Sequence, residues 1–438
     1  MKRLTLTDDP AVIVAALRDF APPADEVRST VTAIVAEVRA HGDDAVSAYS
    51  RRFDKVDLPS DYRVPAAVMQ QALADTAPPL RAALELAAAN IRAYHEREAP
   101  RRWRQTLAQG QVVGQEVVPM RVAGLYVPGG LANYPSSVLM TAIPAQVAGC
   151  ERIVVCSPPR QGEGVPGGGD VTTGGAGDGA AAGVATGVAA ACALLGITDL
   201  YPIGGAQAVA AMACGTAVVP RCDVIVGPGN AYVTEAKRQF MGEVAIDSLA
   251  GPSEVLIVAD AAGNPDWLAA DLLAQAEHGA GAMGVLVDIG GELGERVADA
   301  VAALAAELNI SHDNIAVVAV PDSAAAVAIV NAFAPEHLEL HLDAAAELVP
   351  QIRNAGVIFV GPYAATAFAD YAAGSNHVLP TGGCARFAQG LSVVHFQKRI
   401  GVVELDSAAA QALAPHVTII AEAEGLRSHA RSATLRME

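Results

Sequence analysis

The chain has 438 residues and a formal net charge of −18 at pH 7, so it is too long for one ordinary core and too acidic for a protein that neutralises nucleic-acid phosphates. It contains no stretch of about 18 strongly apolar residues, and the N-terminal MKRLTLTDD turns acidic before any signal-type region develops. The six cysteines form no C-x-x-C pair, so we expect a cytoplasmic protein with reduced thiols.

Helical patterns dominate the first hundred residues. Segments 11–20, 24–42 and 78–98 carry apolar residues at helical spacing, and the last of them repeats an apolar position every three or four residues. We therefore expect residues 23–103 to form a helical arm rather than a catalytic core.

From about residue 120, short apolar runs alternate with alanine-rich helical segments. This alternation predicts an α/β fold with parallel sheets and crossover helices, in which ligands bind at the carboxyl ends of the strands. The expected strands are 122–127, 152–157, 199–204, 223–227, 254–260, 284–290, 314–320 and 355–361.

Two glycine-rich stretches were considered as nucleotide-binding loops. Residues 161–183 are too rich in glycine and alanine to bury a core, and predict a flexible surface insertion. The stretch VGPGNAYV has Gly227 and Gly229 but Tyr232 where a third glycine belongs. Any dinucleotide is therefore bound without the usual fingerprint.

Eight of the ten histidines lie after residue 270, which suggests a metal or acid/base site in that half. In DLLAQAEHGA, a helix from Trp267 to His278 puts Gln275 and His278 on one face. His278 is then either a metal ligand or a cap at the C-terminal end of that helix.

Two further segments carry paired titratable residues. Asp370 and His377 are separated by a Gly-Ser-Asn turn, and either face one cleft or stabilise a loop. Glu424 and His429 lie near the C-terminus and form an exposed surface pair unless the tail docks on a partner.

The stretch APEHLEL puts Glu336 beside His337. Adjacent side chains point about 100° apart on a helix and to opposite faces on a strand, so contiguity alone does not make them a pair. A turn or a helix start after Pro335 would aim both at one cavity.

Taken together, ordered motifs along nearly the whole chain resemble the histidinol dehydrogenase family. They are GLYVPGG, YPSSVLMTAIPAQVAGC, GGAQAVAAMACGT, GPGNAYVTEAKRQ, IDSLAGPSEVLIVAD, DLLAQAEHG, APEHLEL, DYAAGSNHVLPTGG, HFQKR and SHARSATLR. The resemblance implies two incomplete Rossmann-like parallel-sheet domains with a helical N-terminal arm and a C-terminal tail. The implied first domain comprises residues 1–22, 104–126 and 254–390, the second 127–253, and the dimerisation tail 391–438.

The resemblance also implies a chemistry and a set of site residues. Members oxidise L-histidinol to L-histidine with two molecules of NAD, as homodimers with one zinc ion per subunit. The family's zinc ligands fall on Gln275, His278, Asp370 and His429, the last contributed by the partner's tail. The substrate contacts fall on Ser253, Gln275, His278, His337, Asp370, His377, Glu424 and His429. The NAD contacts fall on Tyr126, Gln207 and Asn230.

The family's catalytic pair falls on the neighbours Glu336 and His337. An imidazole suits removal of the alcohol proton, so His337 is the expected base of the first oxidation. A carboxylate suits activation of the water that adds to the aldehyde, so Glu336 is the expected base of the second.

Other functions were weighed against this one. A relative that oxidises a sulfonated propanediol would need a cation where this chain has the anionic Glu424, which suits a substrate ammonium. A zinc hydrolase needs no nucleotide, and a structural zinc protein usually has cysteine-rich ligation. Within the motifs, Glu254 is expected as a cap or surface ion pair, Lys237 on a solvated helix face, and His341 as a structural hydrogen bonder.

Overall fold

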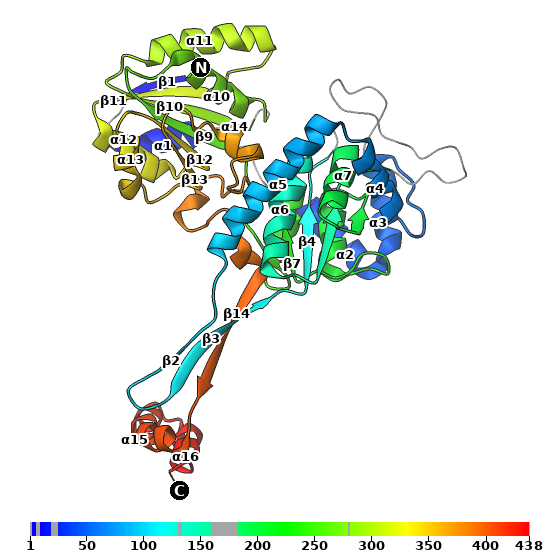
Figure 1. Ribbon diagram of the computed structural model, residues 1–438, viewed down its shortest axis with the longest axis vertical. Helices are drawn as coiled ribbons and strands as arrows, with labels where there is room; N and C mark the ends of the chain where they lie inside the picture. Colours follow the sequence, from blue (N-terminus) through cyan, green and yellow to red (C-terminus); the bar gives the residue numbers. More distant parts are fainter. Residues whose placement is uncertain are drawn as a thin grey trace.

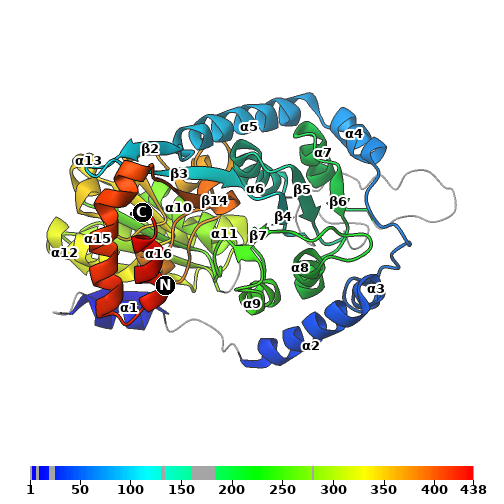
Figure 2. The ribbon, with the colours of Figure 1, turned by 90° about the horizontal axis from the view of Figure 1, so that it is seen from below.

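The computed structural model describes residues 2–5, 9–18, 25–129, 134–159, 183–278 and 281–437. These residues form two α/β lobes, which lie side by side in Figures 1 and 2, and a long arm that carries a helical tail away from them (Figure 1). Almost all of the glycine-rich insertion predicted at 161–183 lies outside the described residues. In the described part of the chain, no helix combines the length and apolarity needed to cross a bilayer.

The first lobe is built on a six-stranded parallel sheet with strand order β1-β11-β10-β9-β12-β13. Its strands are β1 (Lys2–Thr5), β9 (Glu254–Ala259), β10 (Met283–Ile289), β11 (Ile315–Val320), β12 (His337–His341) and β13 (Val357–Val360). Its helices are α1 (Pro10–Arg18), α10 (Pro265–Ala276), α11 (Gly294–Leu308), α12 (Ser323–Phe333), α13 (Ala345–Leu348) and α14 (Thr366–Tyr371), with 3₁₀ turns η2 (Val349–Gln351) and η3 (Cys384–Arg386).

Strand alternation assigns each face of this sheet to its own helices. Leu256 and Val258 of β9 pack with α1, α12 and α13, whereas Val255 and Ile257 pack with α10 and α11. In β12, Leu338 and Leu340 share the first of these cores, so the polar residues between them face the α10 side.

The second lobe is built on a five-stranded parallel sheet with strand order β6-β5-β4-β7-β8. Its strands are β4 (Val122–Tyr126), β5 (Arg152–Cys156), β6 (Asp199–Tyr201), β7 (Val224–Val226) and β8 (Ala245–Ile246). One face is covered by α4 (Ala66–Asp75), α5 (Pro78–Glu98), α6 (Pro135–Ala148), α7 (Thr186–Leu194) and the 3₁₀ turn η4 (Val393–Phe396). The other is covered by α2 (Asp25–His41), α3 (Asp43–Tyr49), the π-helical turn η1 (Ser50–Asp54), α8 (Gly205–Cys214) and α9 (Ala231–Gln239).

The long arm that carries the tail is not the helical arm expected at 23–103. It is an antiparallel three-stranded sheet of order β14-β3-β2, which the sequence did not predict. It comprises β2 (Trp103–Thr106), β3 (Val112–Pro119) and β14 (Gln397–Glu404), and it leads to α15 (Ser407–Ala423) and α16 (Arg427–Thr434). Residues 104–126 were expected in the first domain, and this boundary is wrong. Residues 104–119 belong to the arm, and β4 is the central strand of the second sheet because its partners β5 and β7 lie there.

All eight strands expected from the sequence are confirmed, with ends shifted by a few residues. Strand β12 was not among them, because its residues alternate between apolar and ionisable side chains although all five are buried.

Candidate active site

Ser253, Glu336 and His337 meet where β9 and β12 begin. Ser253 Oγ donates a hydrogen bond of 2.6 Å to Glu336 Oε2, and the backbone N–H of Glu254 donates a second of 2.8 Å to the same oxygen. His337 Nδ1 lies 3.6 Å from Glu336 Oε2. The sequence predicts a site at the carboxyl ends of the strands, and in this lobe that prediction is wrong, because these residues lie at the amino ends of β9 and β12.

His337 is oriented by a backbone contact. Its Nδ1 donates to the carbonyl of Glu254 at 3.1 Å, which leaves the lone pair on Nε2. Nε2 is buried, has no hydrogen-bond partner among the described residues, and lies 3.8 Å from Asp370 Oδ1. The ring stacks on Phe359. The neutral ring of His337 is therefore held in the tautomer whose Nε2 can accept a proton, as a general base must.

Burial governs the charge state of the two neighbouring carboxyls. Desolvation raises the pKa of Glu336, while His337, Ser253 and the Glu254 N–H oppose this rise. Desolvation also raises the pKa of Glu254 to about 7, against the opposing charge of Arg18. Glu254 was expected at a cap or in a surface ion pair, and this is wrong because its side chain is only 4% exposed.

The predicted metal ligands from this chain gather beside His337. Gln275, near the end of α10, is 3% exposed, and its amide nitrogen has no hydrogen-bond partner among the described residues. His278 lies just beyond α10, which ends at Ala276 rather than at His278 as expected, because the chain turns at Glu277. Asp370 lies in α14, which packs against α10.

His377 joins this group because the chain folds back at Gly374, which has a φ of +113°. His377 Nδ1 donates to the backbone carbonyl of Asp370 at 3.0 Å. Burial lowers the pKa of His377, and the nearby imidazoles of His337 and His278 act in the same direction. The structure thus brings together His278, His337, Asp370 and His377, and Gln275 lies in α10, which packs against α14.

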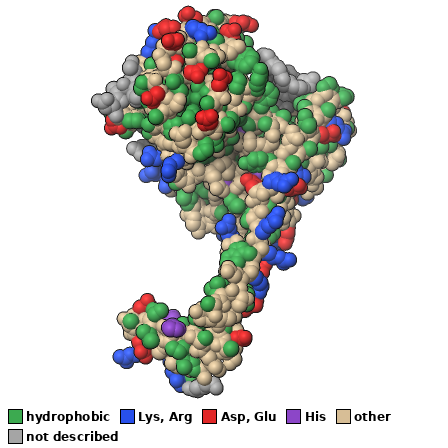
Figure 3. All heavy atoms as spheres, turned by 60° about the vertical axis from the view of Figure 1, so that its left-hand side comes forward, with side chains coloured by type: hydrophobic (Ala, Val, Ile, Leu, Met, Phe, Trp, Pro, Cys, Tyr) green, Lys and Arg blue, Asp and Glu red, His purple; other side chains and the backbone are tan. Residues whose placement is uncertain are grey.

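Two predicted site residues lie elsewhere in the same chain. Glu424 follows the end of α15 and His429 lies in α16, and both are exposed. Figure 3 shows histidine on the surface of this tail, which the arm separates from both lobes. Within one chain, Glu424 and His429 do not approach the other predicted site residues.

The three predicted NAD contacts lie in the second lobe, beyond the carboxyl ends of its strands. Strand order reverses between β4 and β7, which is where ligands bind in open parallel sheets. Tyr126 ends β4, and its hydroxyl accepts from the N–H of Gly205 at 3.1 Å. Gln207 is buried in α8, and Asn230 caps α9 by accepting from the N–H groups of Tyr232 and Val233.

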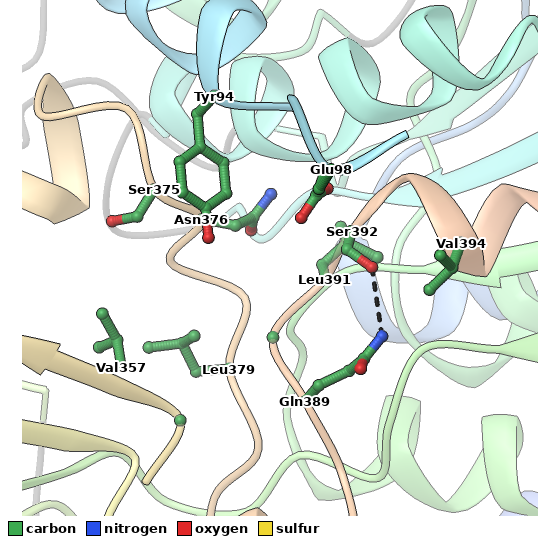
Figure 4. A pocket seen from close by; sticks show the side chains of 12 residues that line it. Tyr94, Glu98, Val357, Ser375, Asn376, Leu379, Gln389, Leu391, Ser392 and Val394 are labelled. Atoms are coloured by element: carbon green, nitrogen blue, oxygen red, sulfur yellow. Dashed lines mark hydrogen bonds between the residues drawn. The ribbon is translucent and has the colours of Figure 1, made fainter. Parts of the chain in front are cut away.

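A cavity of about 380 Å³ lies between α5, the start of β13 and the two loops around Asn376 and Leu391 (Figure 4). It does not contain the predicted catalytic pair, although the backbone N–H groups of Gly356 and Val357 in its wall donate to the carbonyls of Pro335 and Glu336. Of the predicted ligands from this chain, His278 is exposed, Asp370 is half-buried and Gln275 is buried.

A second group of possible ligand atoms belongs to Asp271, Glu339 and His341, which lie within 4.8 Å of one another. His341 Nε2 is 3.1 Å from Glu339 Oε2, which is an ordinary hydrogen bond. Metal-bound histidines usually donate their other N–H to an acceptor, but the buried Nδ1 of His341 has no partner among the described residues. We therefore interpret this group as a buried hydrogen-bonded cluster, as expected for His341.

Sequence reasoning missed the part played by Glu254 and Arg18. The backbone N–H and carbonyl of Glu254 contact Glu336 and His337, and its carboxylate pairs with Arg18 at 3.3 Å. The sequence did carry a signal, because Glu254 stands directly before the apolar run VLIVA. A charged side chain at that position is buried with the strand unless the strand begins at the surface.

Residues 21–168 and 171–437 match the family model described as histidinol dehydrogenase. Histidinol dehydrogenase of Pseudomonas aeruginosa is 44% identical, over 94% of this chain and 91% of that protein. Histidinol dehydrogenase of Dechloromonas aromatica is 43% identical, over 100% and 99%. The crystal structure of histidinol dehydrogenase from Elizabethkingia anophelis superposes with a TM-score of 0.89 at 31% identity, covering 100% and 98%.

Proposed function

The chain belongs to the histidinol dehydrogenase family, and from this premise we propose that it oxidises L-histidinol to L-histidine in two NAD-dependent steps through the aldehyde. One observation carries the proposal most directly. A buried imidazole with a free Nε2 and a buried carboxylate lie side by side, fixed by the backbone carbonyl and the backbone N–H of the same residue, Glu254.

In the first step, His337 acts on the alcohol. Nε2 accepts the hydroxyl proton as the carbinol C–H bond breaks and its hydride leaves, and a C=O bond forms. The hydrogen bond from Nδ1 to the Glu254 carbonyl holds the tautomer that this step needs. NAD supplies the hydride acceptor in both steps.

In the second step, water must add to the aldehyde before hydride can leave again. Glu336 accepts a proton from that water as the new C–O bond forms, and hydride loss from the hydrated aldehyde gives the carboxylic acid. A base works best when its pKa lies near the operating pH, and burial raises the pKa of Glu336 in that direction.

Zinc would be held by Gln275, His278, Asp370 and His429 of the partner subunit. The residues fit this role because a carboxylate, an imidazole and an amide whose oxygen can bind a metal come from Asp370, His278 and Gln275, on the neighbouring helices α10 and α14 and the turn after α10. When bound, zinc supplies a positive anchor for the imidazole and amino nitrogens of the substrate.

The substrate contacts are proposed on the same set, extended by neighbours. Ser253 and His377 contact the substrate from the loops beside the catalytic pair, and Glu424 of the partner subunit pairs with its ammonium. The complete proposed set is Ser253, Gln275, His278, His337, Asp370, His377, Glu424 and His429.

NAD is proposed to lie across the strand-order reversal of the second lobe, in contact with Tyr126, Gln207 and Asn230. The segment from Asp247 to Ser253 leads from this lobe to the catalytic pair. Six residues span at most about 20 Å, so the two half-sites lie within the reach of one extended dinucleotide.

A homodimer is proposed to complete each site with the tail of the other subunit. Support comes from the arm, which holds the tail away from its own lobes (Figure 1), and from apolar side chains that the tail leaves exposed. Ile419 is 65% and Ile420 is 60% exposed, more than a monomer would leave to water at neighbouring positions. A cytoplasmic location is supported by the six cysteines, all of which are free.

The experiment is to count NADH produced per L-histidinol consumed by the zinc-loaded protein and to identify the product by mass. Two NADH with histidine as the product is the expected result. Reduction of NAD with another polar alcohol but not with histidinol would overturn the substrate, and no reduction with either would overturn the activity.

A further inference from the structure

Lys237 lies in α9 and is buried, with 2% of its surface exposed. The sequence suggested a solvated helix face here, and this is wrong because the side chain points into the lobe and pairs with Asp247, whose side chain is 3% exposed. A fully buried ion pair is costly, because both charges lose their water. The other contacts of this ion pair therefore indicate its role.

The pair holds both backbone polar groups of one residue, Gly227. Lys237 Nζ donates to the Gly227 carbonyl at 3.1 Å, and Asp247 Oδ2 accepts from the Gly227 N–H at 2.8 Å. Since Nζ also bonds Asp247 Oδ1, the three groups form a closed ring of charge-assisted hydrogen bonds.

Gly227 itself occupies a demanding position. It follows directly after β7, has a φ of +115°, and passes so close to β4 that an added Cβ would lie 2.1 Å from the carbonyl oxygen of Tyr126. Only glycine fits this close approach. Gly227 therefore lies at the point between β4 and β7 where the strand order reverses.

The loop from Gly227 to Asn230 is held at its other end by the same helix. Asn230 caps α9, and Lys237 lies seven residues further, about two turns along the same face. Helix α9 thus carries both the cap and the lysine. The loop cannot shift without breaking one of them.

We infer that Lys237 and Asp247 are positioning residues that set the loop Gly227–Asn230 for NAD. A buried ion pair gives little net stability compared with well-packed apolar residues, but it fixes geometry at a close backbone crossing. This inference rests on the proposed function, because it takes the reversal point as the NAD site.

The test compares Lys237→Met with Arg238→Met in the full-length protein. Arg238 is the next residue of the same helix and forms an ion pair with Glu235, but its side chain is 40% exposed, so it is a matched control. NAD binding is measured by titration calorimetry with NAD alone, and KM values are measured for NAD and for histidinol.

Lys237→Met should weaken NAD binding roughly tenfold to hundredfold, because a charged donor to the loop is lost. The KM for histidinol and the kcat at saturating NAD should stay within about twofold of the native values, as should every parameter of the control. If the ion pair were merely structural, Lys237→Met would lower the melting temperature of the protein without this selective loss of NAD affinity.

An unchanged NAD dissociation constant in folded Lys237→Met would overturn the inference. If that variant does not fold, Asp247→Asn serves instead, because it keeps an acceptor for the Gly227 N–H and removes the charge. Unchanged NAD binding in Asp247→Asn would also overturn the inference. Failure of the native protein to bind NAD would instead refute the proposed function, so the two failures are distinguishable.

Discussion

Ser253→Ala should change the pH dependence of one half-reaction more than the other. Ser253 Oγ and the Glu254 N–H are the two donors to Glu336 Oε2, at 2.6 and 2.8 Å. Both favour the ionised carboxylate, against the burial that raises its pKa. Removing one hydrogen bond to a buried charge costs about 1.5–3 kcal/mol.

The sign follows from the role of the carboxylate. Loss of the donor raises the pKa of Glu336 further, so at a given pH on the acidic side less of it is in the basic form. At 1.36 kcal/mol per factor of ten, aldehyde oxidation there should slow roughly tenfold to hundredfold and approach the native rate as the pH rises.

The assay is kcat/KM against pH, measured from NADH absorbance with histidinol and with histidinal as separate substrates. Ser253→Thr, which keeps the hydroxyl, is the matched control and should retain the native profile. An equal loss at every pH, with the acidic limb unmoved, would refute the reasoning. Ser253 would then act through substrate binding alone.

Three further predictions follow from particular contacts. His278→Ala and His429→Ala should each be inactive. Random reassociation of the two variants should restore about a quarter of native activity, because half of the dimers are mixed and each mixed dimer carries one intact site out of two. No recovery would contradict tail exchange. Gly227→Ala should lower the free energy of unfolding by about 1–3 kcal/mol in denaturant titrations, since its Cβ would strike the Tyr126 carbonyl; full stability would count against the close crossing. Burial raises the pKa of Glu254 to about 7, so the native state binds an extra proton above the ordinary carboxyl value near 4.5, and stability should fall as pH rises between those values and level off above 7. Unfolding at pH 5 and pH 8 should show this slope in the native protein and a shallower slope in Glu254→Gln, because burial also raises the pKa of Asp271 to about 7.

The sequence predicted the two parallel sheets because their strands are uninterrupted apolar runs, such as VLIVA in β9. It did not predict β12, where Glu339 and His341 alternate with leucines and yet are buried against α10. Polar residues at every second position usually indicate a solvated face. Here that face is covered by a helix that brings its own polar residues, Asp271 and Gln275.

The motifs named the candidate site residues, but not how they are held. The side chains of Glu336 and His337 are not aimed at one place by a helix start or a turn after Pro335, as the sequence suggested. The backbone N–H and carbonyl of Glu254, 82 residues before Glu336, contact the two side chains, because β9 and β12 are neighbours in the sheet. Local pattern also failed for Lys237, since a lysine in a polar helix reads as solvated unless its buried partner Asp247 is known.

The division of labour between Glu336 and His337 is tested most directly by counting NADH formed per active site in Glu336→Gln during a single turnover of histidinol. Gln keeps the side-chain volume and an acceptor for the Ser253 and Glu254 donors, but it cannot take a proton from water. The account predicts two NADH per site for the native protein, and one NADH with histidinal as the product for the variant. Two NADH with histidine from the variant at the native rate would contradict the account.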